Sequence, residues 1–141
     1  MDQKVDSLIR EQCYIDGAWT GQPKNAVTNK ATGAEIAKVP DVGGEGARAA
    51  IEAAHRAFGP WSALLAKERA ALLRRWFDLI IENTDPLARL MTAEQGKPLA
   101  EAKGEVVYGA GFVEFFAEEA KRIYGEIIPS HRPVLDRKSV V

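Results

Sequence analysis

Hydrophobic and polar residues follow a strand-like pattern in the first part of this chain. Residues 13–19 place Asp16 and Gly17 between two short apolar runs, which predicts a hairpin, because a type I′ turn needs positive φ at both central residues. A second pair of short strands is predicted near 26–29 and 35–39. The chain therefore opens with two small hairpins.

Apolar residues then recur at helical spacing. A first helix is predicted over about 44–58, ended by Gly59 and Pro60. Ser62 is a suitable N-cap for a second helix that extends to about Asn83. The apolar stripe of this second helix consists of Leu65, Leu72, Trp76 and Ile80.

Two further helices are predicted. Thr84 is expected to cap a third helix, with Asp85 near the positive end of its dipole and Pro86 where no amide donor is lost. Gly96 is expected to end this helix. A fourth, long helix is predicted over about 99–124, followed by an extended segment.

The fourth helix contains Gly104, Gly109 and Gly111. Each glycine costs about 1 kcal/mol relative to alanine inside a helix, so something is expected to approach the helix closely. Tight packing against another helix is the favoured interpretation, and close approach of a ligand is the alternative.

Three aromatic residues of the same helix, Tyr108, Phe112 and Phe115, share one face. Such a stripe usually belongs to a hydrophobic core, but it can also line an apolar channel. By the residues alone, the core interpretation is favoured. The carboxylates Glu114, Glu118 and Glu119 are followed within a turn by Lys121 and Arg122, which predicts a solvated, salt-bridged surface rather than an acid–base site.

Composition narrows the function classes. The 141 residues carry a net charge of -1, and no basic stripe suggests nucleic-acid binding. No apolar run reaches the ~18 residues that cross a membrane, and the start has no signal-peptide pattern. We therefore expect a cytoplasmic protein. Cys13, the single cysteine, is interpreted as a small strand residue, and His55 and His131 have no metal-ligand spacing.

Several longer segments of the chain carry a resemblance to one enzyme family. Residues 94–106 read EQGKPLAEAKGEV and residues 115–125 read FFAEEAKRIYG. The first segment is similar to a helix–break–helix of the NAD(P)-dependent aldehyde dehydrogenase family, and the second resembles the succinate-semialdehyde dehydrogenase branch of that family. YIDGAW at 14–19 resembles the family's first hairpin. KER at 67–69 with LL at 72–73 matches its second helix. The resemblance covers about residues 12–130.

The resemblance implies an α/β fold. Residues 1–126 would form the first, mostly helical part of a Rossmann-like cofactor domain, and residues 127–141 would begin the strand arm that builds oligomers. The family oxidises aldehydes to acids with NAD or NADP, through a cysteine thiolate that attacks the aldehyde and a glutamate that activates water. The parent enzyme would be a homo-oligomer acting on a small semialdehyde, with succinic semialdehyde favoured.

The resemblance assigns no catalytic, cofactor-binding or metal-binding residue to this chain. The family's catalytic cysteine and glutamate and its cofactor-binding segments come later than Val141. We therefore expect the chain alone to bind no cofactor and to be inactive. The resemblance implies one role for residues of this chain: Tyr108, Phe112 and Phe115 could line the aldehyde channel. The alternative function is a non-catalytic interaction module that docks on a full-length subunit. Because the sheet that such helices cover is missing, the isolated chain is expected to be marginally stable, oligomeric or partly molten.

Overall fold

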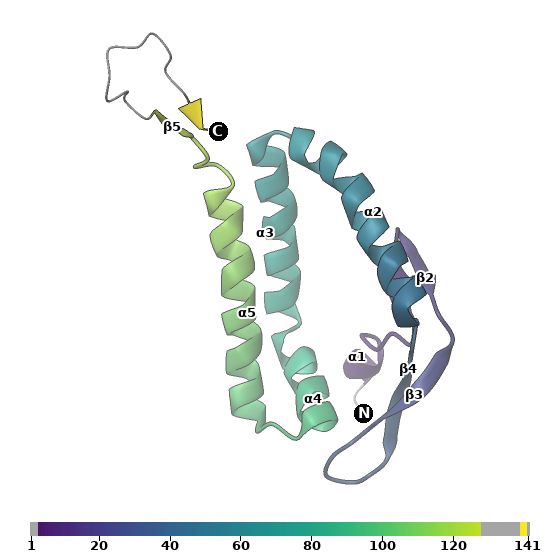
Figure 1. The fold of residues 1–141 in the computed structure, drawn as a ribbon. Helices are drawn as coiled ribbons and strands as arrows, with labels where there is room; N and C mark the ends of the chain where they lie inside the picture. Colours follow the sequence, from purple (N-terminus) through teal and green to yellow (C-terminus); the bar gives the residue numbers. More distant parts are fainter. Residues whose placement is uncertain (1–2, 128–138, 141) are drawn as a thin grey trace.

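The computed structural model describes residues 3–127 and 139–140 of the chain (Figure 1). A short helix and two hairpins come first, then four longer helices. The N-terminal elements are α1 (Gln3–Asp6), β1 (Cys13–Ile15), β2 (Ala18–Thr20), β3 (Pro23–Thr28) and β4 (Glu35–Pro40). The later elements are α2 (Gly43–Ala63), α3 (Ala66–Glu82), α4 (Thr84–Gln95), α5 (Leu99–Glu119), β5 (Glu126–Ile127) and β6 (Ser139–Val140).

Both predicted hairpins are confirmed. β1 and β2 pair antiparallel, and Asp16 and Gly17 have φ values of 53° and 79° at the turn between them. This geometry is the positive φ that a two-residue hairpin loop needs. β3 and β4 form the second antiparallel pair. Arg56 of α2 makes a 2.8 Å ion pair with Asp16, which ties the first hairpin to the helices.

The predicted end of the first helix is wrong. α2 continues through Pro60 to Ala63, because a proline near the end of a helix removes one backbone hydrogen bond without preventing a last turn. Ser62 is therefore not an N-cap; its hydroxyl donates to the Gly59 carbonyl at 2.9 Å. α3 begins after Leu65, whose backbone N–H donates to the Glu68 carboxylate at 2.8 Å.

The junction of α3 with α4 also differs from the prediction. Thr84 does not cap α4; its hydroxyl donates back to the Ile81 carbonyl at 2.9 Å. Gly96 ends α4 as predicted, with φ of 83° and an N–H bond to the Thr92 carbonyl at 2.9 Å. α5 ends at Glu119 and not near residue 124. Beyond it, the backbone N–H groups of Lys121 and Arg122 donate to carbonyls three residues earlier, which tightens the last turn.

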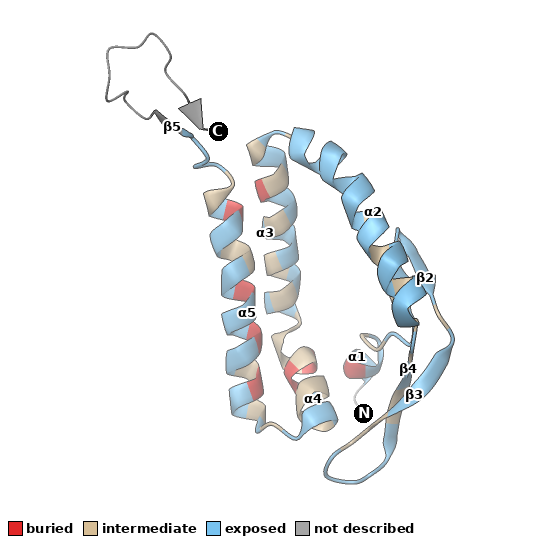
Figure 2. Ribbon diagram, viewed as in Figure 1, coloured by how far each residue is buried: buried red, intermediate tan, exposed pale blue. Residues whose placement is uncertain are grey.

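α5 runs antiparallel beside α3 and α4, whereas α2 leans away from them (Figure 1). The first hairpin lies beside α2, on the side away from α5, whereas β3 of the second hairpin contacts α4 (Figure 1). The core lies where α4 meets α5, as the buried positions in Figure 2 show. It is formed by Ala88, Ala102 and Val106, with Ile80, Leu87, Met91 and Leu99 packed against them.

The buried core is small. Five of the seven buried hydrophobic residues among those described are alanines, whereas eighteen large hydrophobic side chains are exposed. The accessible surface is 10653 Å², about 3,500 Å² more than expected for a compact monomer of this size. Within residues 3–127 and 139–140, no helix combines the length and apolar character needed to span a membrane.

Candidate functional site

Helix α5 has two faces of different composition. Its inner face, against α3 and α4, buries Ala102, Val106, Ala110 and Ala117. These small side chains let the helices approach closely, because interhelical distance follows the size of the side chains at the contact. The outer face carries the three aromatic residues that the sequence singled out.

Tyr108, Phe112 and Phe115 are 69%, 50% and 55% exposed. The core interpretation of this stripe is therefore wrong for the chain as described. The rings of Tyr108 and Phe112 meet edge to face, with centroids 5.0 Å apart. The three residues surround an open hollow of about 460 Å³ on the side of α5, which Val107, Gly111 and Phe116 complete.

The glycines of α5 open this surface further. No heavy atom lies within 4 Å of the position that a β-carbon would take at Gly104, Gly109 or Gly111, the helix's own nearby backbone aside. Tight packing against another described helix, the favoured interpretation, is therefore wrong for these positions. Gly111 leaves the floor of the hollow free between the aromatic side chains.

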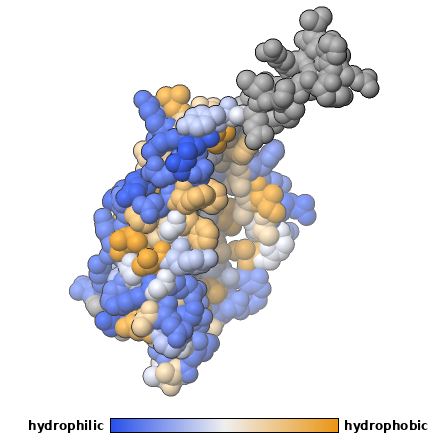
Figure 3. Space-filling model, turned by 90° about the vertical axis from the view of Figure 1, so that its left-hand side faces the viewer, coloured by the Kyte–Doolittle hydropathy of each residue, from blue (hydrophilic) through white to orange (hydrophobic). Residues whose placement is uncertain are grey.

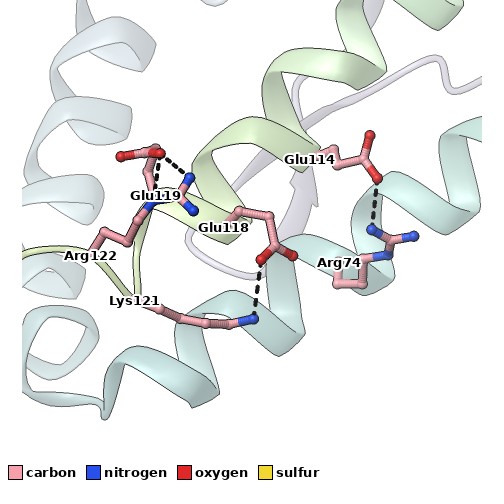
Figure 4. Close-up of polar contacts among 6 residues, drawn as sticks. All are labelled: Arg74, Glu114, Glu118, Glu119, Lys121 and Arg122. Carbon is pink, nitrogen blue, oxygen red and sulfur yellow. Dashed lines mark hydrogen bonds and ion pairs between the residues drawn. The ribbon is translucent and has the colours of Figure 1, made fainter.

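Charged residues near the C-terminal end of α5 are paired, as predicted (Figure 4). Glu114 accepts a 2.7 Å hydrogen bond from Arg74 of α3, and Glu118 lies 3.5 Å from Lys121. Glu119 pairs with Arg122 and raises the pKa of that guanidinium through the hydrogen bond between them. These carboxylates form a salt-bridged surface.

A second ionic cluster ties α4 to α5. The Asp85 carboxylate lies 2.6 Å from Lys103 and 2.6 Å from Arg89. Hydrogen bonds from Lys103 and then Arg89 lower the pKa of Asp85 from 3.8 to about 2. The cluster is exposed to solvent and positions the two helices rather than forming a reactive centre.

The glycine run at 43–46 does not fit a dinucleotide phosphate. A β-carbon at Gly46 would lie 2.3 Å from that of Val42, so this glycine allows local packing at the start of α2. Glu45 places a carboxylate in the first turn, where it would repel a phosphate that the helix dipole would otherwise attract. The described residues therefore offer no phosphate cradle here.

The remaining candidates give no reactive cluster. Cys13 lies in β1 as a free, half-buried residue, in agreement with its interpretation as a strand residue. His55 is exposed on α2, and His131 lies outside the described residues. In the part of the chain that the structure describes, no group of His, Cys, Asp or Glu side chains could hold a metal ion.

The hollow is therefore suited to an apolar group. Its lining is nearly all carbon, with the Tyr108 hydroxyl as its only side-chain polar group. Figure 3, viewed from the side that α5 occupies, shows hydrophobic patches among polar ones. The sequence reasoning missed Val107 and Phe116 as lining residues; Phe116 lies four residues after Phe112, a spacing that could have indicated it.

Comparison with known proteins gives one consistent match. The model of the "Aldehyde dehydrogenase family" matches residues 19–140. A glutarate-semialdehyde dehydrogenase of Pseudomonas aeruginosa is 57% identical, covering 100% of this chain and 29% of the relative. An NADP(+) succinate-semialdehyde dehydrogenase of Escherichia coli is 53% identical, covering 96% of this chain and 28% of the relative.

Solved structures agree. An NADP-dependent enzyme of Escherichia coli superposes with a TM-score of 0.84 at 54% identity, over 90% of this chain and 27% of that one. Betaine aldehyde dehydrogenase of Staphylococcus aureus, solved with NAD+, superposes with a TM-score of 0.83 at 31% identity, over 94% of this chain and 28% of that one. The hairpins and helices are thus the N-terminal part of this α/β fold. The chain spans less than a third of the length of these proteins.

Proposed function

The chain belongs to the aldehyde dehydrogenase family, and we propose that it acts as the N-terminal part of an enzyme that oxidises a small semialdehyde to its acid with NAD or NADP. The observation that carries this proposal is the 57% identity to a glutarate-semialdehyde dehydrogenase over the whole chain. The fold match at a TM-score of 0.84 supports it.

This chain would supply scaffold rather than chemistry. None of its described residues forms a nucleophile–base pair, and its glycine run does not fit the cofactor phosphates. The dinucleotide, when bound to the parent enzyme, accepts the hydride. The groups that hold it and attack the aldehyde would come from the part of the parent enzyme that follows these helices. We also propose the division of the chain at residue 126 between cofactor domain and arm; most of the arm lies outside the described residues.

We further propose that Tyr108, Phe112 and Phe115 form one wall of the aldehyde channel. An apolar hollow suits the carbon chain of a small aldehyde, because ligand sites are mostly apolar with few polar groups. The hollow lacks a cationic side chain, so the carboxylate of a semialdehyde would be recognised by groups elsewhere in the parent enzyme. This wall would therefore set the fit of the substrate's carbon chain.

The relatives support one class of substrate. Glutarate-semialdehyde and succinate-semialdehyde dehydrogenases both match the chain at more than 50% identity. These two substrates share an aldehyde and a carboxylate and differ by one methylene, which a hydrophobic pocket distinguishes by only about 1–3 kcal/mol. We propose a semialdehyde of this type, with succinic semialdehyde as the first substrate to assay.

A chimera tests the function directly. The 141 residues would replace the matching segment of the Pseudomonas aeruginosa relative, and NAD(P)H formation would be followed with succinic and glutaric semialdehydes. We expect activity from the chimera and none from the 141-residue chain alone. A folded, oligomeric chimera that oxidises neither semialdehyde nor any other short aldehyde would refute the proposal.

The channel wall needs a variant with a matched control. In the chimera, Phe112→Ala changes the hollow, whereas Phe58→Ala removes an equally large exposed ring from α2, away from α5. We expect Phe112→Ala to change the KM for the semialdehyde several-fold while the KM for the cofactor stays constant. Equal changes in the KM for the semialdehyde in the two variants would refute the proposed channel role.

A further inference from the structure

We propose that the turn between β1 and β2 is a modification site, at which Asp16 converts to isoaspartate through attack by the backbone nitrogen of Gly17, and that Arg56 of α2 restrains this conversion. The conversion would be a property of the chain itself, independent of the proposed function. All three groups lie within the described residues, and the reaction needs no partner other than water.

Asp16 and Gly17 form the only Asp-Gly pair in the chain. An aspartate side chain and the next backbone nitrogen can close a five-membered ring, and a side chain on the next residue hinders that approach. Glycine has no β-carbon, so the approach at Gly17 is open. Each of the other aspartates is followed by a residue that carries a side chain. Asp16 is therefore the position at which ring closure is easiest.

The hairpin turn leaves the attacking nitrogen free. Asp16 is the one non-glycine residue with positive φ among those described, at 53°, a value that is uncommon for residues with a side chain. The Gly17 N–H has no hydrogen-bond partner within residues 3–127 and 139–140. No existing hydrogen bond to this nitrogen has to break before it attacks.

Arg56 holds the carboxyl group that must react. Its Nη2 donates to Oδ2 of Asp16 at 2.8 Å. The ion pair restricts the rotation of the Asp16 side chain, so the carboxyl carbon meets the Gly17 nitrogen less often while the pair is closed. The side chains of Asp16 and Arg56 are 65% and 59% exposed, and exposed pairs are weak. The rate of conversion therefore depends on how often this pair opens.

The covalent steps balance with water alone. The Gly17 nitrogen loses its proton and forms a bond to Cγ of Asp16, while one carboxyl oxygen leaves as water. Water then opens the cyclic imide. Breaking the bond from the nitrogen to Cγ restores aspartate, whereas breaking its bond to the main-chain carbonyl carbon leaves the backbone passing through Cβ and Cγ as isoaspartate. Nothing is oxidised or reduced.

Isoaspartate would release the first hairpin from α2. The backbone gains a methylene at residue 16, and the free carboxylate moves onto Cα. A two-residue turn with positive φ at both positions does not fit this longer backbone, and the carboxylate leaves its place beside Arg56. Because α2 buries none of its own residues, the ion pair is an important tie between the helix and the hairpin. The modification thus acts as a slow switch of hairpin docking.

Peptide mapping of the 141-residue chain during storage at neutral pH tests the site. An endoproteinase that cleaves before aspartate but not before isoaspartate reports the loss of aspartate at each position. We expect a steady loss at Asp16 and little at Asp41, which is also exposed and outside the helices and strands but precedes a valine. Equal losses at the two positions, or no loss at Asp16 even in urea, would overturn the modification site.

Replacing Arg56 tests the restraint. Arg56→Gln removes the ion pair, whereas Arg48→Gln removes an exposed positive charge elsewhere on α2. We expect aspartate at residue 16 to be lost several-fold faster with Arg56→Gln, and at the unchanged rate with Arg48→Gln. Arg56→Lys, which keeps a cation there, should stay close to the unchanged chain.

Urea separates the restraint from other effects of these variants. All the chains should react at one rate in urea, because the ion pair is lost on unfolding, and circular dichroism checks that each keeps its helices in buffer. Equal rates in buffer for Arg56→Gln and the unchanged chain would contradict the restraint, and so would a difference that persists in urea.

Discussion

The two faces of α5 differ in residue size and in burial. The inner face buries alanines and one valine against α3 and α4, while the outer face exposes Tyr108, Phe112 and Phe115. A helix that is apolar on both sides is normally covered on both sides. The contrast indicates that the inner face holds this unit together, whereas the outer face is left uncovered by the described residues.

The largest effect should follow from enlarging a residue of the inner face. Ala102 is fully buried in the cluster between α4 and α5, so Ala102→Leu is expected to destabilise the chain by about 1–3 kcal/mol through overpacking. Urea unfolding followed by circular dichroism measures the change. The matched outer-face variant, Phe112→Ser, should change the stability by less than about 0.5 kcal/mol. A reversed order would show that the outer face carries the core.

The turn between α4 and α5 should be the next most sensitive position. Gly96 has φ of 83°, a conformation in which a β-carbon is strained, so Gly96→Ala should destabilise the chain by about 1 kcal/mol. Gly33, also at positive φ but in the β3–β4 turn, offers a comparison away from the helices. If Gly96→Ala were neutral, the position of α5 against α4 would not depend on this cap.

Replacing a glycine of α5 should have the opposite sign. Gly109 lies inside the helix, and a β-carbon there would meet no other atom, so Gly109→Ala should stabilise the chain by up to about 1 kcal/mol. Thermal unfolding at a fixed, low protein concentration measures this gain. A loss of stability would mean that another part of the chain packs on Gly109 in solution.

Local signals in the sequence predicted much of the fold. Asp16-Gly17 specified a hairpin, and Gly96 specified the end of α4, because both depend on backbone conformations that few residues adopt. The helix boundaries predicted at Pro60, Ser62 and Thr84 were wrong. A proline late in a helix leaves the helix intact, and so does a hydroxyl that donates to a carbonyl of the preceding turn.

The candidate site was predicted only in part. Helical spacing placed Tyr108, Phe112 and Phe115 on one face, but spacing cannot show whether that face is covered. The glycines showed the same limit, because Gly104 and Gly111 indicated a close approach without indicating what approaches. What covers a helix depends on residues distant in sequence, and the structure alone showed that this face is open.

The smallest effect concerns the ionic cluster that ties α4 to α5. The pKa of Asp85 is lowered to about 2 by Lys103 and Arg89, so the charged carboxylate binds protons less readily in the folded chain than in the unfolded one. Its contribution to stability is present above about pH 4 and is lost as the pH falls through 2. Because the pairs are exposed, the contribution is small and weakens with salt.

Asp85→Asn should therefore lower the free energy of unfolding slightly at neutral pH. The difference in free energy of unfolding between this variant and the unchanged chain should vanish near pH 2. Asp78→Asn, which removes a single exposed pair with Arg74, serves as the control. A difference for Asp85→Asn that persists unchanged at pH 2 would show that the side chain acts through its shape rather than its charge.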